Sequence, residues 1–416
     1  MEFRRFLAVR EQGGDVCNVT EEVTSREIPA LIQAEEKGQD RAIIFKNIAD
    51  YPGEVVGNVY GATKRINNAT GAEDTGEFYN AVDRAIAAPQ EPVFIPFDGS
   101  DYIVTAKPDL SKQLPQIVHS EHDSTPYITS GVVIARHPET GRHHMCFVRL
   151  SVQEDNKVLF NPRTFRIKEI ADKTLGQGEP LDIVILIGAP SEITLLGGLS
   201  IPDEVDEVEF VQAWGGENIK FHDQDLPVPA GTEMVLFGHV VPENRPEGPF
   251  GDMRGFYITN PNPVCEITEM WQRKDVKYHT VLGGMSHEHI GLVTLKAYHD
   301  MERIKARFPG VVDYQLPHYA AGQLGLVTVT EDVAKKELAQ ALADVSLTEL
   351  FILLNEDTDA GIPEEVLWAL TQRANSQDDY VFDDGDRDKG ITKRAVIDAT
   401  DEDLSDWRNK RVEIFE

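Results

Sequence analysis

The sequence predicts a mixed α/β fold of several domains, because three stretches of the chain follow three different patterns. Helix-like and strand-like segments alternate in residues 1–100. Short β-branched runs separated by glycine and proline fill most of residues 101–290, which is typical of an antiparallel sheet or barrel. Strand and helix patterns alternate again in residues 291–416. A chain of 416 residues is also too long for one ordinary hydrophobic core.

The first and second stretches contain clear individual elements. Residues 28–37 have the apolar spacing of an amphipathic helix, and residues 42–45 form a short apolar strand. These two elements predict an N-terminal α/β domain over residues 1–100. The central strands are predicted at residues 102–106, 128–135, 182–188 and 233–240, and they define a sheet domain over residues 101–290.

The third stretch predicts a C-terminal α/β domain over residues 291–416. Residues 292–305 are interpreted as a strand that leads into a helix. Strand, helix and strand then follow at residues 325–329, 332–342 and 349–354, an order that implies a βαβ unit. In the tail, the Asp- and Gly-rich residues 378–388 are predicted to form a loop. Residues 401–411 are predicted to form a charged helix that could dock on a neighbouring subunit.

Composition excludes several classes of protein. The net charge of -31 argues against a nucleic-acid partner, because phosphate binding needs a basic surface. Cys17, Cys146 and Cys265 have no paired spacing, so neither a disulfide framework nor a zinc cluster is indicated. The first residues are too charged for a signal peptide, and no apolar run reaches membrane-spanning length. We therefore expect a soluble protein of the reduced cytoplasm, without membrane partners.

The most informative motif is PEGPFGD at residues 246–252. Its glycines and prolines interrupt any helical periodicity, so we expect a rigid loop. Such a loop would hold Glu247 and Asp252 near each other, and two neighbouring carboxylates can serve as an acid/base pair with separated pKa values. The same residue types also form ordinary surface turns, so the motif alone does not decide between the two interpretations.

Four segments in the same order resemble the UbiD family of decarboxylases, which use prenylated flavin mononucleotide (FMN). They are residues 141–150 (GRHHMCFVRL), 200–210 (SIPDEVDEVEF), 246–252 and 393–400 (KRAVIDAT). The resemblance implies that the central domain is a split β-barrel that carries the flavin. It also implies catalytic roles for Arg149, Glu247 and Asp252. The planar fork of an arginine can hold a substrate carboxylate with two hydrogen bonds, while one of the two acids returns a proton to the product.

The resemblance further implies a set of cofactor contacts and a metal site. The expected cofactor-binding residues are Phe147, Val148, Arg149, Asn161, Arg163, Arg166, Glu207 and Arg394, the last in place of a family lysine. The expected metal ligands are Glu207 and His144, for Mn²⁺ or Mg²⁺, with K⁺ as a further candidate ion. His144 replaces the asparagine that is usual in the family, and Glu207 lies in an acidic cluster that could simply be a solvated turn.

Two histidine pairs, His143 with His144 and His287 with His289, lack the spacing of a helical zinc motif. If residues 287–289 formed a strand, both of its histidines would face the same side. This segment lies where members of the UbiD family line the substrate pocket. Either a pocket role or a structural role is therefore open for His287 and His289.

The resulting hypothesis is a reversible, non-oxidative decarboxylase of an aromatic, heteroaromatic or α,β-unsaturated acid. Loss of carbon dioxide from such an acid leaves a carbanion that needs an organic electron sink. The expected partners are the small carboxylic acid, a flavin prenyltransferase that supplies the cofactor, and further copies of the chain in a homodimer or homohexamer. Two alternatives stay open: a flavin-free, metal-dependent lyase, and a non-catalytic subunit of a larger carboxylase assembly.

Overall fold

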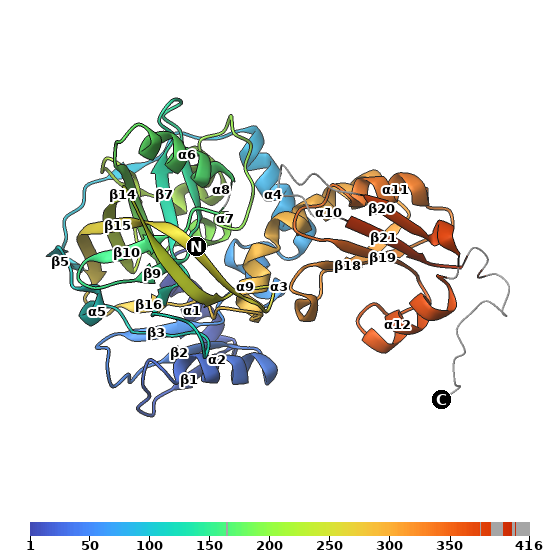
Figure 1. Ribbon diagram of the computed structural model, residues 1–416, viewed down its shortest axis with the longest axis horizontal. Coiled ribbons are helices and arrows are strands. Elements are labelled where there is room, and N and C mark those ends of the chain that lie inside the picture. The colour runs from blue at the N-terminus through green and yellow to red at the C-terminus, as the bar shows by residue number, and fades with distance from the viewer. Residues whose placement is uncertain (164, 375, 384–393, 402–403, 405–416) are drawn as a thin grey trace. The chain divides into compact units, whose positions relative to one another are not determined.

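The structure is a computed structural model that describes the chain except for residues 164, 375, 384–393, 402–403 and 405–416. The chain divides into two compact units, Met1–Val293 and Thr294–Glu416 (Figure 1). Among the described residues, no helix combines the length and the apolar character needed to cross a membrane. The helix predicted at residues 401–411, apart from residues 401 and 404, and the end of the loop predicted at residues 378–388 lie outside the described residues.

The first unit begins with a small sheet in the order β1-β2-β3-β16. Its elements are α1 (Phe3–Gln12), β1 (Val16–Val19), α2 (Ile28–Lys37), β2 (Ala42–Phe45), β3 (Glu54–Gly57) and β16 (Lys277–His279). The predicted helix α2 and strand β2 are therefore confirmed. Helix α2 buries Ile28 and Ile32 on one face, as the apolar spacing requires. Because β16 pairs with β3 in parallel, a segment from far along the chain completes this sheet.

A nine-stranded antiparallel sheet forms the centre of the first unit, in the order β6-β9-β10-β15-β14-β11-β7-β8 with β5 also pairing with β15. Its strands are β5 (Tyr102–Ala106), β6 (Tyr127–Ile128), β7 (Val132–Arg136), β8 (His143–Phe147), β9 (Leu150–Val152), β10 (Lys157–Phe160), β11 (Leu181–Ile187), β14 (Met234–Gly251) and β15 (Tyr257–Arg273). The predicted antiparallel sheet is confirmed. No pairing of the described residues joins β6 to β8, so the sheet is open rather than a closed barrel.

Helices and one small sheet surround the central sheet. They are α3 (Thr63–Ala69), α4 (Thr75–Ala87), α5 (Leu110–Gln113), α6 (Phe165–Gly176), α7 (Ser191–Leu196), α8 (Glu207–Gly215), α9 (His287–Val293), and strands β4 (Phe94–Ile95), β12 (Phe221–His222) and β13 (Val228–Pro229). A single core cluster joins the two larger sheets, since Phe45 and Val55 of the first pack in the same cluster as Val133 and Ile185 of the second. Burial of this apolar surface holds the first unit together.

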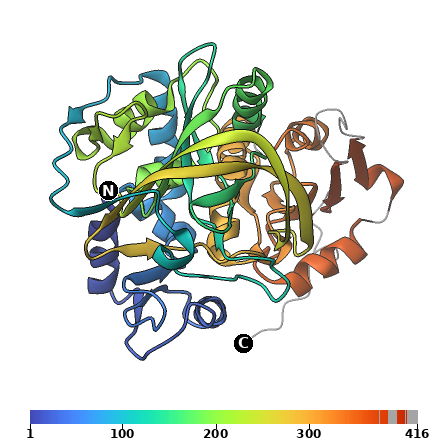
Figure 2. The ribbon, with the colours of Figure 1, turned by 60° about the vertical axis from the view of Figure 1, so that its left-hand side comes forward.

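The loop predicted at residues 246–252 is wrong, because residues 246–251 are part of strand β14. Figure 2 shows β14 and β15 as two long, bent yellow strands that run side by side. The register shifts between Val240 and Asn244 and again between Glu247 and Phe250. Such bulges let a strand contain prolines, which cannot donate to the ladder. Gly248 has a φ of 100°, which only glycine adopts without strain.

The second unit is a five-stranded sheet in the order β17-β18-β19-β21-β20 with helices on both faces. Its elements are α10 (Leu295–Arg307), β17 (Val311–Gln315), β18 (Leu324–Val329), α11 (Lys335–Leu342), β19 (Leu350–Asn355), α12 (Pro363–Gln372), β20 (Tyr380–Asp383) and β21 (Arg394–Ala399). The predicted β18-α11-β19 unit is confirmed by parallel pairing. One core lies under α10 and α11, and a second lies under α12.

Two predictions for this part of the chain are wrong. Residues 292–305 form the end of α9 and most of α10, without a strand. The reason is that Leu295, Met301 and Ile304 are buried on one face of α10, so the helical period overrides the local β-branched residues. Residues 380–383 of the predicted loop form β20, which pairs with β21 and is thereby stabilised.

The bulge in β14 gives the first testable prediction. A Cβ added at Gly248 would approach the Ile258 carbonyl oxygen to 2.6 Å, and the positive φ adds strain, so Gly248→Ala should lower the free energy of unfolding by roughly 1–3 kcal/mol. Gly176 ends α6 and has open space around its Cα, so Gly176→Ala serves as the control and should be neutral or stabilising. Thermal unfolding of both variants measures the difference. Equal melting temperatures would contradict the assigned backbone geometry.

Candidate active site

The centre of the candidate site is an ion pair between Arg149 and Glu247. Arg149 lies in the short gap between β8, which pairs with β7, and β9, which pairs with β6 and β10. Its Nε donates to Glu247 Oε1 at 2.9 Å, and its Nη2 donates to Oε2 at 3.0 Å. This is the bidentate, or two-pronged, geometry in which a guanidinium and a carboxylate bind each other most strongly. The sequence-predicted pair is thus brought together from residues far apart in the chain.

Glu247 is held by more than the arginine. Its side chain is 1% exposed, and the side-chain amide of Asn262 on β15 also donates to Oε2. A buried carboxylate is tolerable only when its charge is paired and its oxygens accept hydrogen bonds. Both conditions are met, so Glu247 is fixed in place and in turn fixes the plane of the Arg149 guanidinium.

Asp252 is placed differently from Glu247. It follows the last residue of β14, in the turn toward β15, and its Oδ2 lies 3.9 Å from Arg149 Nη1. Its side chain is 26% exposed, so it stays in contact with solvent. The Phe250 ring packs against the guanidinium, with 4.6 Å between the Arg149 Cζ and the ring centroid. The arginine therefore has one tightly bound acid, one loosely bound acid and an aromatic neighbour.

Two further titratable groups near this centre were missed or left open by sequence analysis. Asp123 accepts the Gly251 N–H at 2.8 Å and the Ser120 N–H at 3.0 Å, and burial raises its pKa. Burial lowers the pKa of His289, and the charge of Arg149 adds to this effect while that of Asp252 opposes it. No local sequence pattern marks either residue, because both pKa shifts arise from tertiary packing.

His287 and His289 lie at the start of helix α9 and not in a strand, so the shared side that a strand would give them does not arise. In a helix, residues two apart point in different directions and cannot share a face. The backbone N–H of His289 donates to the Ser286 hydroxyl at 3.2 Å, and its Nδ1 lies 3.0 Å from the Gly284 carbonyl.

A cavity of about 690 Å³ lies close to the Arg149–Glu247 pair. The polar residues that line it are Asn161, Arg163, Lys168, Asp172, Asn244, Asn260 and Asn262, and Lys168 is paired with Asp172. Asn262 connects the cavity to Glu247. The two side-chain polar atoms of Asn161 are buried and have no partner among the described residues. Buried amides normally find partners, so this lining fits a polar ligand that carries hydrogen-bonding groups and an anionic end, as a flavin nucleotide does.

The predicted metal ligands His144 and Glu207 also meet. Asp206 caps α8 by accepting the Val208 N–H at 2.9 Å, which places Glu207 at the first helical position. His144 Nδ1 lies 3.0 Å from both Glu207 oxygens, and Arg166 Nη1 donates to Oε1 at 2.6 Å. Burial is the largest single effect on the pKa of His144 and lowers it, but the charges and hydrogen bonds of Glu207 and Cys146 together outweigh burial and raise this pKa to about 10.

These residues supply only part of the ligand set that a metal site needs. No group of three or more His, Cys, Asp or Glu side chains suited to a metal ion occurs in the part of the chain that the structure describes. The Arg166 guanidinium already neutralises Glu207. The Nε2 of His144 is buried and lacks a partner among the described residues. Both predicted ligands are thus present, but the raised pKa keeps a proton on His144 that an ion would have to displace. The ion would also need the rest of its ligands from water or a phosphate.

The remaining predicted cofactor residues fall into two places. Phe147 ends β8, and a Cβ at Gly197 would approach its ring to 2.9 Å, so this glycine allows the ring to lie close to the backbone. Val148 is buried beside it. Arg394 begins β21 in the second unit, where its guanidinium donates to the Ala343 carbonyl. The structure therefore gathers all the predicted cofactor residues except Arg394 in the first unit.

Comparison with known proteins gives the family of the chain. Residues 98–286 match the 3-octaprenyl-4-hydroxybenzoate carboxy-lyase Rift-related domain, residues 292–399 match its C-terminal domain, and residues 7–85 match its N-terminal domain. The chain belongs to the UbiD family. It is a UbiD-family decarboxylase, and the resemblance seen in the four ordered motifs is confirmed.

Similar proteins extend over nearly the whole chain. Anhydromevalonate phosphate decarboxylase of Methanothermobacter thermautotrophicus is 27% identical over 408 residues, which are 95% of this chain and 94% of that one. The UbiD-class enzyme HmfF from Pelotomaculum thermopropionicum, solved with FMN, is 25% identical with a TM-score of 0.88, covering 99% of this chain and 97% of that one. An evolved dimeric form of HmfF, solved with prFMN, shares the fold at 24% identity, a TM-score of 0.87 and the same coverage.

The unpartnered amide of Asn161 gives a prediction for ligand binding. Asn161→Leu removes a buried polar group that costs about 1–3 kcal/mol when unpaired, so the flavin-free protein should unfold at a higher temperature. The same change should weaken FMN binding by about tenfold, the value of one or two hydrogen bonds. Fluorescence titration with FMN and thermal unfolding measure the two effects.

A paired amide outside the cavity provides the control. Asn156 donates to the Ile267 carbonyl at 2.7 Å, so Asn156→Leu should lower the melting temperature and leave FMN binding unchanged. Unaltered FMN affinity in Asn161→Leu would show that the ligand does not contact this amide.

Proposed function

We propose that this chain is a prenylated-FMN-dependent, reversible, non-oxidative decarboxylase of an aromatic, heteroaromatic or α,β-unsaturated carboxylic acid. Membership of the UbiD family and the flavin complexes of similar structures support the cofactor. The single observation that carries the proposal is the two-pronged Arg149–Glu247 pair, with Asp252 beside it and an amide-lined cavity adjoining it. These groups match what the chemistry requires: a carboxylate binder, a proton source and a cofactor site.

Arg149 orients the substrate in this proposal. Two of its nitrogens bind Glu247, while Nη1 faces Asp252 at a longer distance and is the group left for a substrate carboxylate. Glu247 cannot turn away without leaving its own charge buried and unpaired, so the guanidinium plane is fixed before the substrate binds. Such preorganisation removes an entropic cost from the reaction. Phe250 behind the guanidinium keeps water from one side of it.

Asp252 carries the proton. When bound, prenylated FMN supplies the electron sink that the departing carbon dioxide makes necessary. Asp252 is partly exposed and only loosely paired, so it can take a proton from solvent and give it to the product carbon. Glu247 is too firmly bound by Arg149 and Asn262 for this task. We therefore assign the proton donor to Asp252 and the orienting role to Glu247.

The cofactor contacts follow from the same arrangement. Asn161 offers donors and acceptors to the flavin, and Arg163 offers charge to its phosphate, since the charge of Lys168 is already paired with Asp172. Arg166, Glu207 and His144 form a polar cluster. Glu207 and His144 would hold Mn²⁺ or Mg²⁺, with K⁺ as a further candidate ion, which would supply positive charge to offset that of the phosphate. A flavin prenyltransferase would supply the cofactor, and a homodimer or homohexamer is the proposed assembly. The domain boundaries at residues 100 and 290, and a cytoplasmic location, also stay predictions.

The test is co-expression with a flavin prenyltransferase, followed by mass spectrometry of the released ligand and a screen for carbon dioxide release. The screen contains phenolic, heteroaromatic and cinnamic-type acids, together with anhydromevalonate phosphate, the substrate named for one similar protein. Release of prenylated FMN and turnover of one of these acids are expected. Turnover by a flavin-free protein with added metal would instead favour the metal-dependent lyase. Flavin binding without turnover of any acid would favour a non-catalytic subunit.

The division of roles between the two acids is testable. Asp252→Asn should slow turnover by about two to four powers of ten, the usual worth of a positioned general acid, while sparing flavin binding. Glu247→Gln should also lower turnover, because the guanidinium loses its fixed plane. Since the groups act as a unit, the double variant should be little slower than the slower single variant. Product formation in deuterated water, with proton exchange of the product, measures each step.

Glu266 on β15 offers a matched control, because it is a surface acid paired with Lys157 at 3.5 Å. Glu266→Gln should leave turnover unchanged. Undiminished turnover in both Asp252→Asn and Glu247→Gln would place the chemistry elsewhere in the protein.

A further inference from the structure

Helix α9 is joined to the candidate site by the loop that precedes it. A Cβ added at Gly283 would lie 3.3 Å from the Phe250 ring, and one added at Gly255 would lie 3.1 Å from the Met285 sulfur. Phe250 is the ring that packs on the Arg149 guanidinium. The loop of residues 283–286 therefore lies directly against the segment that carries Phe250 and Asp252.

His289 extends this contact from the helix itself. Its Nδ1 lies 3.0 Å from the Gly284 carbonyl and must donate to it, because a carbonyl oxygen can only accept. Its lowered pKa keeps the ring neutral near pH 7, which leaves Nε2 as an acceptor. The charged or titratable groups that act on this ring are Arg149, Asp252, Glu288 and His119. The position of α9 therefore determines where the neutral imidazole of His289 lies relative to the charges of Arg149 and Asp252.

A buried acid, Glu288, holds the other side of α9. Both Glu288 and His279 of β16 are fully buried. A single oxygen, Glu288 Oε1, accepts the Tyr60 N–H at 3.0 Å and lies 2.9 Å from His279 Nε2. The second oxygen, Oε2, is buried and has no partner among the described residues. One oxygen therefore makes both bonds that tie α9 to the segment after β3 and to β16.

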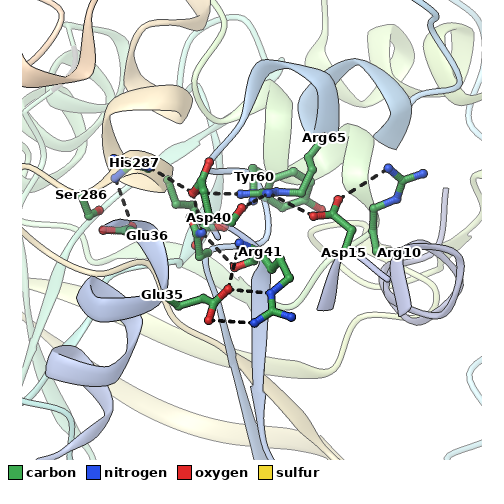
Figure 3. Close-up of polar contacts among 12 residues, drawn as sticks. Arg10, Asp15, Glu35, Glu36, Asp40, Arg41, Tyr60, Arg65, Ser286 and His287 are labelled. Atoms are coloured by element: carbon green, nitrogen blue, oxygen red, sulfur yellow. Dashed lines mark hydrogen bonds and ion pairs between the residues drawn. The ribbon is translucent and has the colours of Figure 1, made fainter. Parts of the chain in front are cut away.

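Two more acids hold the first residue of the helix (Figure 3). Glu36 of α2 accepts the His287 N–H at 3.1 Å, and Asp40 lies 3.1 Å from His287 Nδ1. Figure 3 shows both acids joined to His287. Asp40 also binds Asn58 at 2.9 Å, so this end of α9 is connected to the N-terminal sheet region.

We propose that Glu288 is a positioning residue for the decarboxylation, acting through α9 on His289 and Phe250 and thereby on Arg149 and Asp252. A leucine of similar volume would fill this buried position without the cost of a buried charge. The carboxylate instead supplies one oxygen at a fixed reach for two donors from two different elements. The positioning of α9 therefore depends on the length of the Glu288 side chain rather than on its charge. This inference rests on the proposed site at Arg149 and Asp252.

Two conservative variants separate the effect of side-chain length at residue 288 from the effect of its charge. Glu288→Gln keeps an acceptor oxygen at the same distance, so the flavin-loaded enzyme should keep its kcat within about twofold. Glu288→Asp keeps the charge and shortens the side chain by one methylene, so α9 must shift or lose a bond. A displacement of about 1 Å in a catalytic site can cost about a hundredfold in rate. We therefore expect kcat to fall at least tenfold in Glu288→Asp, with an unchanged KM for the acid.

The readout specific to positioning is the titration of His289. When α9 shifts, the imidazole gains water, so the pKa of His289 should rise toward its ordinary value in Glu288→Asp. A protonated His289 would add a positive charge near Arg149 and Asp252. The acid limb of kcat against pH should therefore move to higher pH together with the pKa of His289. Nuclear magnetic resonance of the imidazole in flavin-free protein measures the pKa without any turnover. This measurement therefore tests the placement of α9 even if the proposed reaction or cofactor is wrong.

Glu233 is the matched control, because it is also fully buried and its carboxylate is held by Arg4 and the Lys277 N–H rather than by a residue of α9. Glu233→Asp should lower stability but move neither the acid limb nor the His289 titration. Three results would overturn the proposal: wild-type kcat in Glu288→Asp, a large loss in Glu288→Gln, or a loss in Glu288→Asp without any shift of His289.

Discussion

The ion pair between Arg149 and the buried Glu247 is the interaction on which the rest of the site depends. Taking both charges out of water is costly, and the cost is offset only while both arms of the pair are made. Every neighbouring element therefore has to keep these two residues in register. The gap between β8 and β9, the bulges of β14 and the Asn262 amide of β15 all serve this one geometry.

The long strand pair β14–β15 is the means by which the fold satisfies this requirement. Glu247 and Asn262 come from its two strands, and Asp252 follows the last residue of β14. A bulge next to Glu247 changes the direction in which its side chain points, as bulges near functional sites often do. Because the acids share one hairpin, the firmly paired acid and the exposed acid have a fixed separation, and their different environments produce their different roles.

Sequence reasoning predicted the architecture better than the course of individual segments. The helix at residues 28–37, the antiparallel central sheet and the β18-α11-β19 unit follow from hydrophobic spacing. Residues 246–252 could not be assigned to a strand, because their prolines and glycines are tolerated only through bulges formed with β15. Helix α9 could not be assigned either, since it is stabilised by Glu36 and by Glu288 with His279, all through tertiary contacts.

The candidate site divides in the same way. Arg149, Glu247 and Asp252 were identified because ordered motifs mark them, and the structure places them together. Asp123 was missed, and His289 was left open, because burial defines their chemistry and no local pattern reports burial. Asn161 was expected as a cofactor contact, but only the structure reveals that its amide is buried and lacks a protein partner among the described residues.

The amide of Asn161 has a consequence for the amount of enzyme in a cell. A ligand that completes its hydrogen bonds binds the folded chain and not the unfolded one, so it stabilises the protein by mass action. At a ligand concentration of about 100 times the Kd, this linkage is worth about 2.7 kcal/mol, enough to alter how often the chain unfolds and meets proteases. The supply of cofactor would then set how long each molecule survives as well as whether it is active.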